Sequence, residues 1–476
     1  MRTLIALLSL PLLGCPTATP SPDPTPEEPT PFELIDWDKG QPDIEGQRVR
    51  QLRELRTIAH LHSHWSHDAC DGDPQPGGVP DEACLQDLRD ALCTTRIDVA
   101  FLSDHPGHAT ETDYATLLLL RDDDEPVAGS DGDPVANRMT CPDGHRVLML
   151  PGIESSDMMP LALDRHIDGD YGPLTGEAYD RASAAGGVKW IAHTESRDLD
   201  ELAASGLDGI ELYQLHANLA PDIREEWLGL PAFGFLADVG PFFFAESHGI
   251  VEPPHPDLAP LGFLLLNEPS IIALETLGQT QKIGVTGGTD AHQNVFPSDA
   301  GDGERIDSYR RMMRWFNNRL RVDLAADADP SPALVEEALR EARSHIVFEV
   351  FGTPVGFDMT VQGTGVAELG DEVVFEAGME VVVTPPTLDP RSPRADVSPI
   401  VITRIYFADA TGRTLLTEAE GDAEVRVAVP GPGLVRTEVW IQPLHLAPYL
   451  GELAADYADR TVPWLQTGGI FLRESR

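Results

Sequence analysis

Apolar runs that end in polar residues alternate with helix-like segments between residues 46 and 350. Each run is short and continuously apolar, as expected of a buried strand. The predicted strands are residues 97–105, 146–155, 187–194, 209–214 and 282–292. Residues 81–92 carry leucines at helical spacing, and residues 331–342 start with an N-cap serine followed by proline. This alternation predicts an α/β fold with a parallel sheet, for which a barrel is the candidate architecture.

The pattern changes at about residue 351. From there to residue 476 the chain shows short alternating segments separated by proline and glycine turns, with few helix signals. This predicts a smaller, separate all-β domain of the sandwich type over 351–476, after an α/β domain over 46–350.

The N-terminus, MRTLIALLSLPLLGC (residues 1–15), has one positive charge and a short apolar run. The run is too short to span a bilayer and is typical of a secretion signal. PLLGC resembles a bacterial lipobox, which implies cleavage before Cys15 and acylation of that cysteine; an ordinary signal peptide is the alternative. Residues 16–45 start proline-rich and predict an extended tether. We therefore expect an exported protein, lipid-anchored to a bacterial membrane at the periplasmic or cell surface, that touches the membrane only through this anchor.

Net charge bears on the partners of the chain, and cysteine content bears on its disulfides. The chain of 476 residues has 34 Lys and Arg against 79 Asp and Glu, a net charge of −45. Phosphate backbones would repel it, so we expect a small-molecule substrate and no nucleic-acid partner. Beyond Cys15, an exported chain with four cysteines predicts two disulfides with three possible connectivities. Loop length alone favours the sequential pairs, Cys70 with Cys84 and Cys93 with Cys141.

Side chains that can bind metals follow the predicted strands. They are His62 and His64, Asp104 and His105, Glu154, His193, and Asp290 and His292. The carboxyl ends of parallel strands meet at one edge, where active sites lie. Ionised groups gathered so closely would be costly without a cation between them, so this series predicts a metal site.

The motifs HLHSH, LSDH, PGIE, RHIDG, IAHT and GTDAH, taken in this order, resemble those of the PHP (polymerase and histidinol phosphatase) superfamily of metallohydrolases. The resemblance covers about residues 56–350 and implies a distorted (β/α)7 barrel. Within the superfamily, the region after GTDAH and the β-rich tail look similar to bacterial proteins of the carbaryl-hydrolase-like (CehA/McbA) type.

The resemblance also implies a set of ligands for two to three divalent transition-metal ions. The first ion would take His62, His64, Glu154 and Asp290; the second would share Glu154 and take His166 and His193; the third would take His105, His292 and either Asp68, our choice, or His67. His60 stands where the family usually has aspartate, and is either a ligand or a partner that orients one.

Mixed histidine and carboxylate ligation suits zinc, manganese or iron. Such ions activate water for hydrolysis. Asp104, Glu154 and Asp290 are the expected catalytic residues, with Asp104 orienting a ligand or moving a proton. The leading expectation is a phosphoesterase. The alternatives are a carbamate, ester or amide hydrolase, and a surface protein that binds a glycan or a partner and keeps a structural metal.

Arginines cluster in residues 303–321 of this acidic chain. Arg305, Arg310 and Arg311 could offer forked donors to an anionic substrate. The interpretation we favour is a helix whose arginines pair with nearby carboxylates while its apolar residues pack inward.

Overall fold

The structure is a computed structural model that describes residues 37–475 except 45, 157, 170 and 172–174. The predicted signal segment, Cys15 and most of the predicted tether therefore lie outside the described residues. The described residues belong to one compact unit that mixes helices with a 17-stranded sheet and two smaller sheets.

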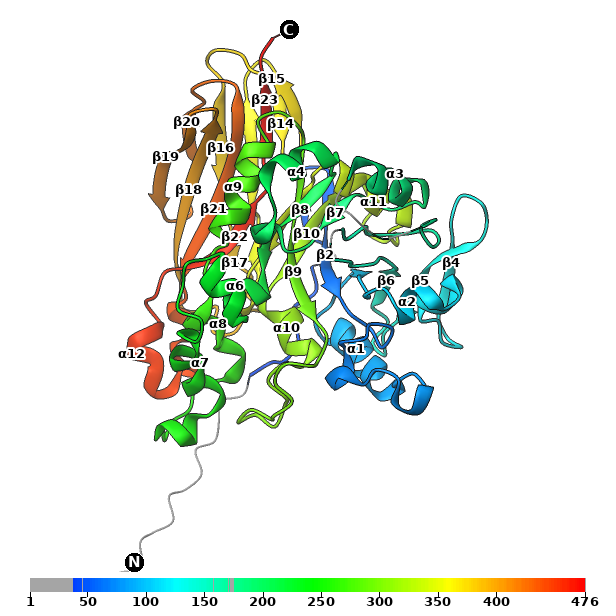
Figure 1. Cartoon of the computed structure of the whole chain (residues 1–476). Coiled ribbons are helices and arrows are strands. Elements are labelled where there is room, and N and C mark those ends of the chain that lie inside the picture. Colours follow the sequence, from blue (N-terminus) through cyan, green and yellow to red (C-terminus); the bar gives the residue numbers. More distant parts are fainter. Residues whose placement is uncertain (1–36, 45, 157, 170, 172–174, 476) are drawn as a thin grey trace, which may run out of the picture. The chain divides into compact units, whose positions relative to one another are not determined.

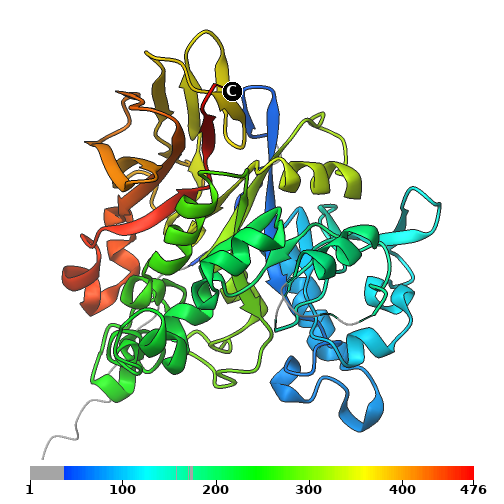
Figure 2. The same cartoon turned by 45° about the horizontal axis from the view of Figure 1, so that its top comes forward.

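Strands of the N-terminal part of the large sheet start at residue 48. They are β1 (Arg48–Val49), β2 (Leu52–Leu61), β3 (Val99–Leu102), β4 (Glu125–Ala128), β5 (Pro134–Thr140), β6 (Arg146–Leu150), β7 (Trp190–Ile191), β8 (Gly209–Gln214), β9 (Gly284–Ala291), β10 (Asn317–Val322) and β11 (Ser344–Val347). Six of them run parallel in the order β7-β8-β9-β2-β3-β6. Strand β2 lies in the middle of this series and is buried along almost its whole length (Figures 1 and 2).

Helices flank these strands. They are α1 (Glu82–Thr94), α2 (His108–Glu111), α3 (Gly176–Ala184), α4 (Leu199–Ser205), α5 (Leu215–Leu219), α6 (Pro221–Glu226), α7 (Phe235–Phe243), α8 (Pro260–Phe263), α9 (Glu268–Leu277), α10 (Tyr309–Trp315), α11 (Pro332–Arg340) and α12 (Ala454–Tyr457). The two helices that the sequence predicted start with side-chain caps: Asp81 accepts from the N–H groups of Ala83 and Cys84 at α1, and Ser331 accepts from that of Leu334 at α11.

All five predicted strands and both predicted helices are present. The parallel order confirms a mixed α/β fold with a large sheet. The edges of the parallel series, β6 and β7, are linked through an irregular segment, where Leu161 forms an isolated bridge with Val188. The (β/α)7 barrel itself stays a prediction.

The chain beyond residue 350 is mostly strands, as its alternating pattern predicted. They are β12 (Pro354–Val355), β13 (Asp358–Gln362), β14 (Val366–Glu368), β15 (Glu372–Val374), β16 (Glu380–Thr384), β17 (Thr387–Leu388), β18 (Ile400–Asp409), β19 (Gly412–Glu420), β20 (Val425–Ala428), β21 (Gly433–Gln442), β22 (Val462–Thr467) and β23 (Ile470–Arg473). Strand β11 pairs with β22, so the α/β part and the C-terminal part share one sheet. The boundary at residue 350 stays a prediction, and the shared sheet was not predicted.

Residues 303–321 are not one helix, contrary to our expectation. Helix α10 ends at Trp315, Phe316 takes an extended conformation (φ −157°, ψ 159°), and β10 follows. Strand β10 pairs with both β2 and β11, and this pairing outweighs the local helical tendency.

The predicted disulfides are confirmed. Cys70 is bonded to Cys84 and Cys93 to Cys141. Both bonds fix α1, which carries Cys84 and Cys93, to neighbouring segments of the α/β part.

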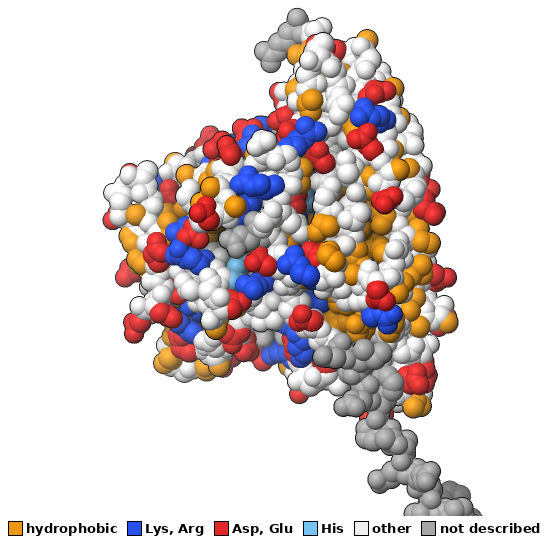
Figure 3. Space-filling model, turned by 180° about the vertical axis from the view of Figure 1, so that it is seen from behind, with side chains coloured by type: hydrophobic (Ala, Val, Ile, Leu, Met, Phe, Trp, Pro, Cys, Tyr) orange, Lys and Arg blue, Asp and Glu red, His pale blue; other side chains and the backbone are white. Residues whose placement is uncertain are grey.

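The surface seen in Figure 3 mixes acidic and basic side chains, and hydrophobic side chains gather in one area of this face. Among the described residues, no single helix is long and apolar enough to cross a bilayer. Pro256–Phe263 and Glu268–Leu277, which are bent by 70°, reach the required length and composition only as a pair.

Candidate metal centre

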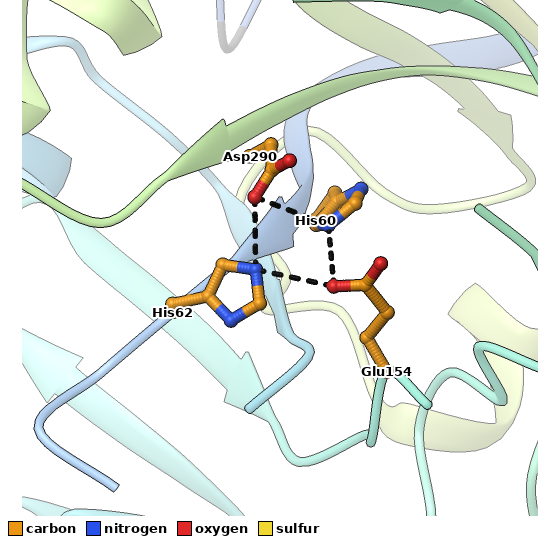
Figure 4. Close-up of side chains that lie close together, drawn as sticks. All are labelled: His60, His62, Glu154 and Asp290. Atoms are coloured by element: carbon orange, nitrogen blue, oxygen red, sulfur yellow. Dashed lines mark hydrogen bonds and ion pairs between the residues drawn. The ribbon is translucent and has the colours of Figure 1, made fainter. Parts of the chain in front are cut away.

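Four buried side chains meet at the carboxyl ends of the parallel strands (Figure 4). His60 and His62 come from the end of β2, Glu154 follows β6, and Asp290 is near the end of β9. The Nε2 atom of His60 lies 2.8 Å from Glu154 Oε2 and 3.3 Å from Asp290 Oδ1. The Nε2 atom of His62 lies 3.4 Å and 3.1 Å from the same two oxygens. Two imidazoles and two carboxylates therefore face one point.

The other ring nitrogen of each histidine is held by an acceptor. The Nδ1 atom of His60 lies 2.7 Å from Glu211 Oε1. The Nδ1 atom of His62 lies 3.1 Å from Ser66 Oγ, whose own proton is donated to Asp68. An Nδ1–H donor in both rings leaves the Nε2 lone pairs directed at the shared point, which is how proteins orient metal-binding imidazoles.

Gly288 of β9 makes room for the carboxylate that holds His60. A Cβ atom at this position would lie 1.9 Å from Glu211 Oε1. The second of the paired glycines in GVTGGTD thus lets a side chain from β8 pass across β9 at close range.

Each carboxylate of the centre also offers its second oxygen. Glu154 Oε1 lies 3.3 Å from His193 Nε2, and Asp290 Oδ2 lies 2.8 Å from His216 Nδ1. Gln214 Nε2 donates to the same Asp290 oxygen at 3.0 Å. Each carboxylate therefore directs one oxygen at His60 and His62 and the other at a further histidine. A ligand that bridges two cations needs this geometry.

Three overlapping groups could hold cations. Their ligand atoms lie within 4.8 Å of one another, and the groups are His60, His62, Glu154 and Asp290; His62, Asp68 and His105; and His216, Asp290 and His292. Buried His216 Nε2 and His292 Nδ1 have no hydrogen-bond partner. Unpaired buried nitrogens in groups that also hold carboxylates fit a transition metal.

Backbone strain marks the same residues. His60, His193 and Asp290 have φ values of 63°, 52° and 49°, in the left-handed region that side chains other than glycine rarely adopt. Such strain persists where the surrounding structure fixes it, and it gathers at functional sites.

The electrostatics show that positive charge is needed here. Burial lowers the pKa of His62, but hydrogen bonds with Asp290 and Glu154 outweigh this effect and raise the pKa to about 10. Burial also lowers the pKa of His193, but hydrogen bonds with Glu154 and Glu195 outweigh this effect and raise the pKa to about 10. Burial would raise the pKa of Glu154, but the charge of His60 holds it well below its usual range. Protons on the imidazoles thus take the place that a cation could fill.

The structure does not bring every expected ligand together. His64 lies beyond the end of β2, with Nδ1 3.1 Å from the carbonyl oxygen of Asp81. His166 contacts the carbonyl oxygen of Thr112 at 2.8 Å. Neither belongs to the three groups. Because His64 lies three residues beyond the end of β2, where the chain has turned, the pair at the centre is His60 and His62, two residues earlier than expected.

Asp68 and His67 were left as alternatives. Asp68 Oδ2 lies 3.2 Å from His105 Nε2, whereas His67 is exposed. Asp104 accepts from Ser63 N at 2.5 Å and Ser63 Oγ at 2.8 Å. It therefore holds the backbone next to His62, the first of its two expected roles.

The arginines expected as a possible anion site are paired with carboxylates. Arg310 and Arg311 both bond to buried Asp257. Arg305 bonds to Asp71 at 2.9 Å and Asp307 at 2.7 Å. These contacts match the interpretation we favoured, in which the arginines balance local acidic residues.

Sequence reasoning assigned no role to Glu211 and placed His216 outside the ligand set. A glutamate inside the apolar run GIELYQ, and a histidine directly after it, are the signals that could have found them.

Comparisons with known proteins add little. No protein-family model and no curated protein matches the chain. Among solved structures, the chain is similar to a two-domain protein containing a predicted PHP-like metal-dependent phosphoesterase from Bacteroides vulgatus, with 14% identity over 92% of this chain and 99% of that chain. The TM-score of this match is 0.32.

Proposed function

We propose that the chain is a metal-dependent hydrolase of the PHP type that cleaves phosphoesters. One observation carries the proposal. The buried imidazoles of His60 and His62 are each held through Nδ1, and their Nε2 atoms face the carboxylates of Glu154 and Asp290. Two or three divalent ions of zinc, manganese or iron would lower the pKa of a water molecule and neutralise charge on the substrate oxygens.

The contacts of the residues indicate which would bind the cations and which would position the ligands. Glu154 and Asp290 would hold neighbouring cations through their two oxygens, with His60, His62 and His193 completing the sites. Glu211, Ser66 and Asp104 would position these ligands. In the reaction, the oxygen of water bonds to phosphorus, the bond from phosphorus to the alcohol oxygen breaks, and a proton from water ends on the departing alcohol.

Elemental analysis and a substrate panel test the proposal. Metal-free protein reloaded with Zn²⁺, Mn²⁺ or Fe²⁺ should bind two to three ions and hydrolyse p-nitrophenyl phosphate or bis(p-nitrophenyl) phosphate. Glu154→Gln should lower both metal content and turnover, whereas Glu418→Gln, on the edge strand β19, should leave both unchanged. Full metal content in Glu154→Gln would contradict the bridging role.

A carbamate, ester or amide hydrolase is the second candidate. His216 also lines a largely apolar cavity, which favours an uncharged substrate. Turnover of aryl carbamates or carboxyl esters, but of no phosphoester, would replace the first candidate by this one. Stoichiometric metal with no turnover on the panel would favour the binding protein instead.

We also propose that the chain is exported and lipid-anchored through Cys15. The support is the lipobox-like sequence and the presence of two disulfides, which an oxidising compartment favours. Mass spectrometry of the N-terminal peptide should show an acylated cysteine that Cys15→Ser removes.

A further inference from the structure

A cavity of about 570 Å³ adjoins the metal centre. Helices α5, α7, α8 and α10 and the loop after β9 line it, and the apolar lining includes Leu219, Phe235, Val239, Phe263, Met312 and Trp315. The volume is within the range of small-molecule sites, about 300–1,000 Å³.

The cavity offers few polar contacts to a ligand. Its lining holds three ionisable side chains, His216, His248 and Asp307. Asp307 is already engaged, because it accepts from the N–H groups of Val295 and Phe296 and bonds to Arg305. No lysine or arginine is part of the lining that the structure describes. The cavity therefore suits an uncharged, apolar group and offers no cation to an anion.

His216 connects the cavity with the metal centre. Its ring lines the cavity, while its Nδ1 atom lies 2.8 Å from Asp290 Oδ2 and its ring centroid lies 5.3 Å from that of His292. A group bound in the cavity thus lies next to a residue that contacts Asp290 of the centre.

Large apolar side chains lie exposed at the rim of the cavity. Phe233 is 64% exposed, Leu236 46% and Phe244 45%, and all three line the cavity. Covering such surface is favourable, and apolar patches around a concave site mark places where ligands bind.

We propose that this cavity receives a bulky, uncharged hydrophobic substituent of the substrate, so that the substrate is an ester of an apolar alcohol. This inference rests on the proposed hydrolase function. The cavity binds the apolar substituent, and the ester group lies beyond His216, at the carboxylates of the centre.

A series of alkyl p-nitrophenyl phosphodiesters, from methyl to octyl, tests the inference on the metal-loaded full chain. We expect kcat/KM to rise by about two- to fourfold per methylene until the chain fills the cavity, since each buried methylene gains the corresponding transfer free energy. Turnover that is independent of chain length would overturn the inference and leave the proposed function standing.

Two matched variants locate the effect. Leu219→Trp should fill part of the cavity and reduce the ratio of octyl to methyl kcat/KM by at least about tenfold. Leu415→Trp, at an exposed apolar position on β19, should keep the wild-type ratio. Equal ratios in Leu219→Trp and Leu415→Trp would overturn the assignment to this cavity.

A binding measurement separates this inference from the hydrolase function. Metal-free protein should bind the neutral fluorophore N-phenyl-1-naphthylamine at one site, 1-octanol should displace it, and Leu219→Trp should weaken its binding by at least about tenfold. Binding with this pattern, but without turnover of any ester, would refute the hydrolase and leave the apolar ligand site. If the protein neither bound the fluorophore nor hydrolysed any ester, both the cavity assignment and the hydrolase function would be overturned.

Discussion

His60 and His62 lie on one strand end, and the position of that end decides which histidines can act together. His60 is the last residue but one of β2 and His62 directly follows the strand, and both rings point toward the carboxylates. Strand β2 ends at Leu61, and the chain then turns. His64 continues the alternation in the sequence but not in space, because the period of two holds only within a strand.

Replacing single histidines tests this register. We expect His62→Asn to weaken metal binding by more than about 100-fold, beyond the 10- to 100-fold typical of residues that only orient a ligand. His64→Asn keeps a side-chain donor for the carbonyl oxygen of Asp81 and should bind metal as the wild type does. Metal titration followed by elemental analysis measures both. Equal losses in the two variants would favour the register predicted from the sequence.

Glu211 is the residue through which β8, which is separated from β2 by β9, holds His60. Its two oxygens contact His60 Nδ1 at 2.7 Å and the backbone N–H of His193 at 2.9 Å. Glu211→Gln keeps the volume but removes the charge, so we expect metal affinity to fall by about 10- to 100-fold while the fold is retained. Competition with a metal chelator measures the affinity, and circular dichroism checks the fold. Unchanged affinity would show that the contact has no part in orienting His60.

Much of the candidate site could be predicted from strand ends alone. Glu154, His193, Asp290 and His292 directly follow or end apolar runs, and the structure brings them together. Glu211 could not be found in this way, because its role depends on β8 lying beside β9, where Gly288 leaves room for the glutamate side chain. Which strands are neighbours is a property of the topology, which a local pattern does not contain.

At the scale of elements, the disulfide Cys70–Cys84 connects the segment after β2 to α1. The segment also contacts the loop that follows β9: the N–H of Cys70 donates to the carbonyl oxygen of His292 at 2.9 Å. The bond therefore holds α1, the loop after β2 and a residue of the metal centre in one arrangement.

Removing each disulfide in turn separates stability from binding. Cys70→Ala with Cys84→Ala should lower the free energy of unfolding by about 3 kcal/mol, from the loop-entropy estimate, and should also weaken metal binding. Cys93→Ala with Cys141→Ala opens a longer loop away from the centre, so it should cost about 4 kcal/mol and leave metal affinity unchanged. Denaturant unfolding and metal titration measure the two effects. Unaltered affinity in both double variants would contradict a link between Cys70 and the centre.

The change from α10 to β10 shows where element prediction from sequence fails. Arg319, Leu320 and Arg321 alternate as strand residues do, but arginine and leucine also favour helix, and the preceding residues are helical. The antiparallel partners of β10 are far away in sequence, with Leu320 opposite Leu55 and Ser344. Pairing with both neighbours satisfies the backbone of β10, and no local pattern of the segment specifies that pairing.

At the scale of the whole molecule, hydrogen bonds cross the expected domain boundary. Val347 of β11 pairs with Leu465 of β22, and buried Arg321 of β10 donates to the carbonyl oxygen of Phe357 at 2.8 Å. The composition shift at residue 351 predicted a separate all-β domain, which stays a prediction, although strands predominate beyond that residue. It could not show that the two parts join at a common sheet, because hydrogen bonding between strands leaves little trace in the polarity of either part.

The stability of the whole chain should depend on pH in opposite ways with and without metal. The pKa of His62 and of His193 is about 10 in the folded protein, above the value of about 6.5 for an unfolded chain. In the metal-free protein these protons add stability that is complete below pH 6.5 and is lost as the pH rises toward 10. A bound cation replaces the protons, so its affinity should increase over the same range.

The melting temperature of metal-free and metal-loaded protein, measured from pH 6.5 to pH 10, tests this linkage. We expect the difference between the two forms to grow with pH, because the metal-free form loses stability while the loaded form gains ligand binding. His62→Asn provides the control, since it removes one of the raised groups and should flatten the pH dependence of the metal-free form. His64→Asn should retain the wild-type curve. A difference that shrinks as the pH rises would mean that protons and cations do not compete for the same carboxylates, and would contradict a metal site at His60, His62, Glu154 and Asp290.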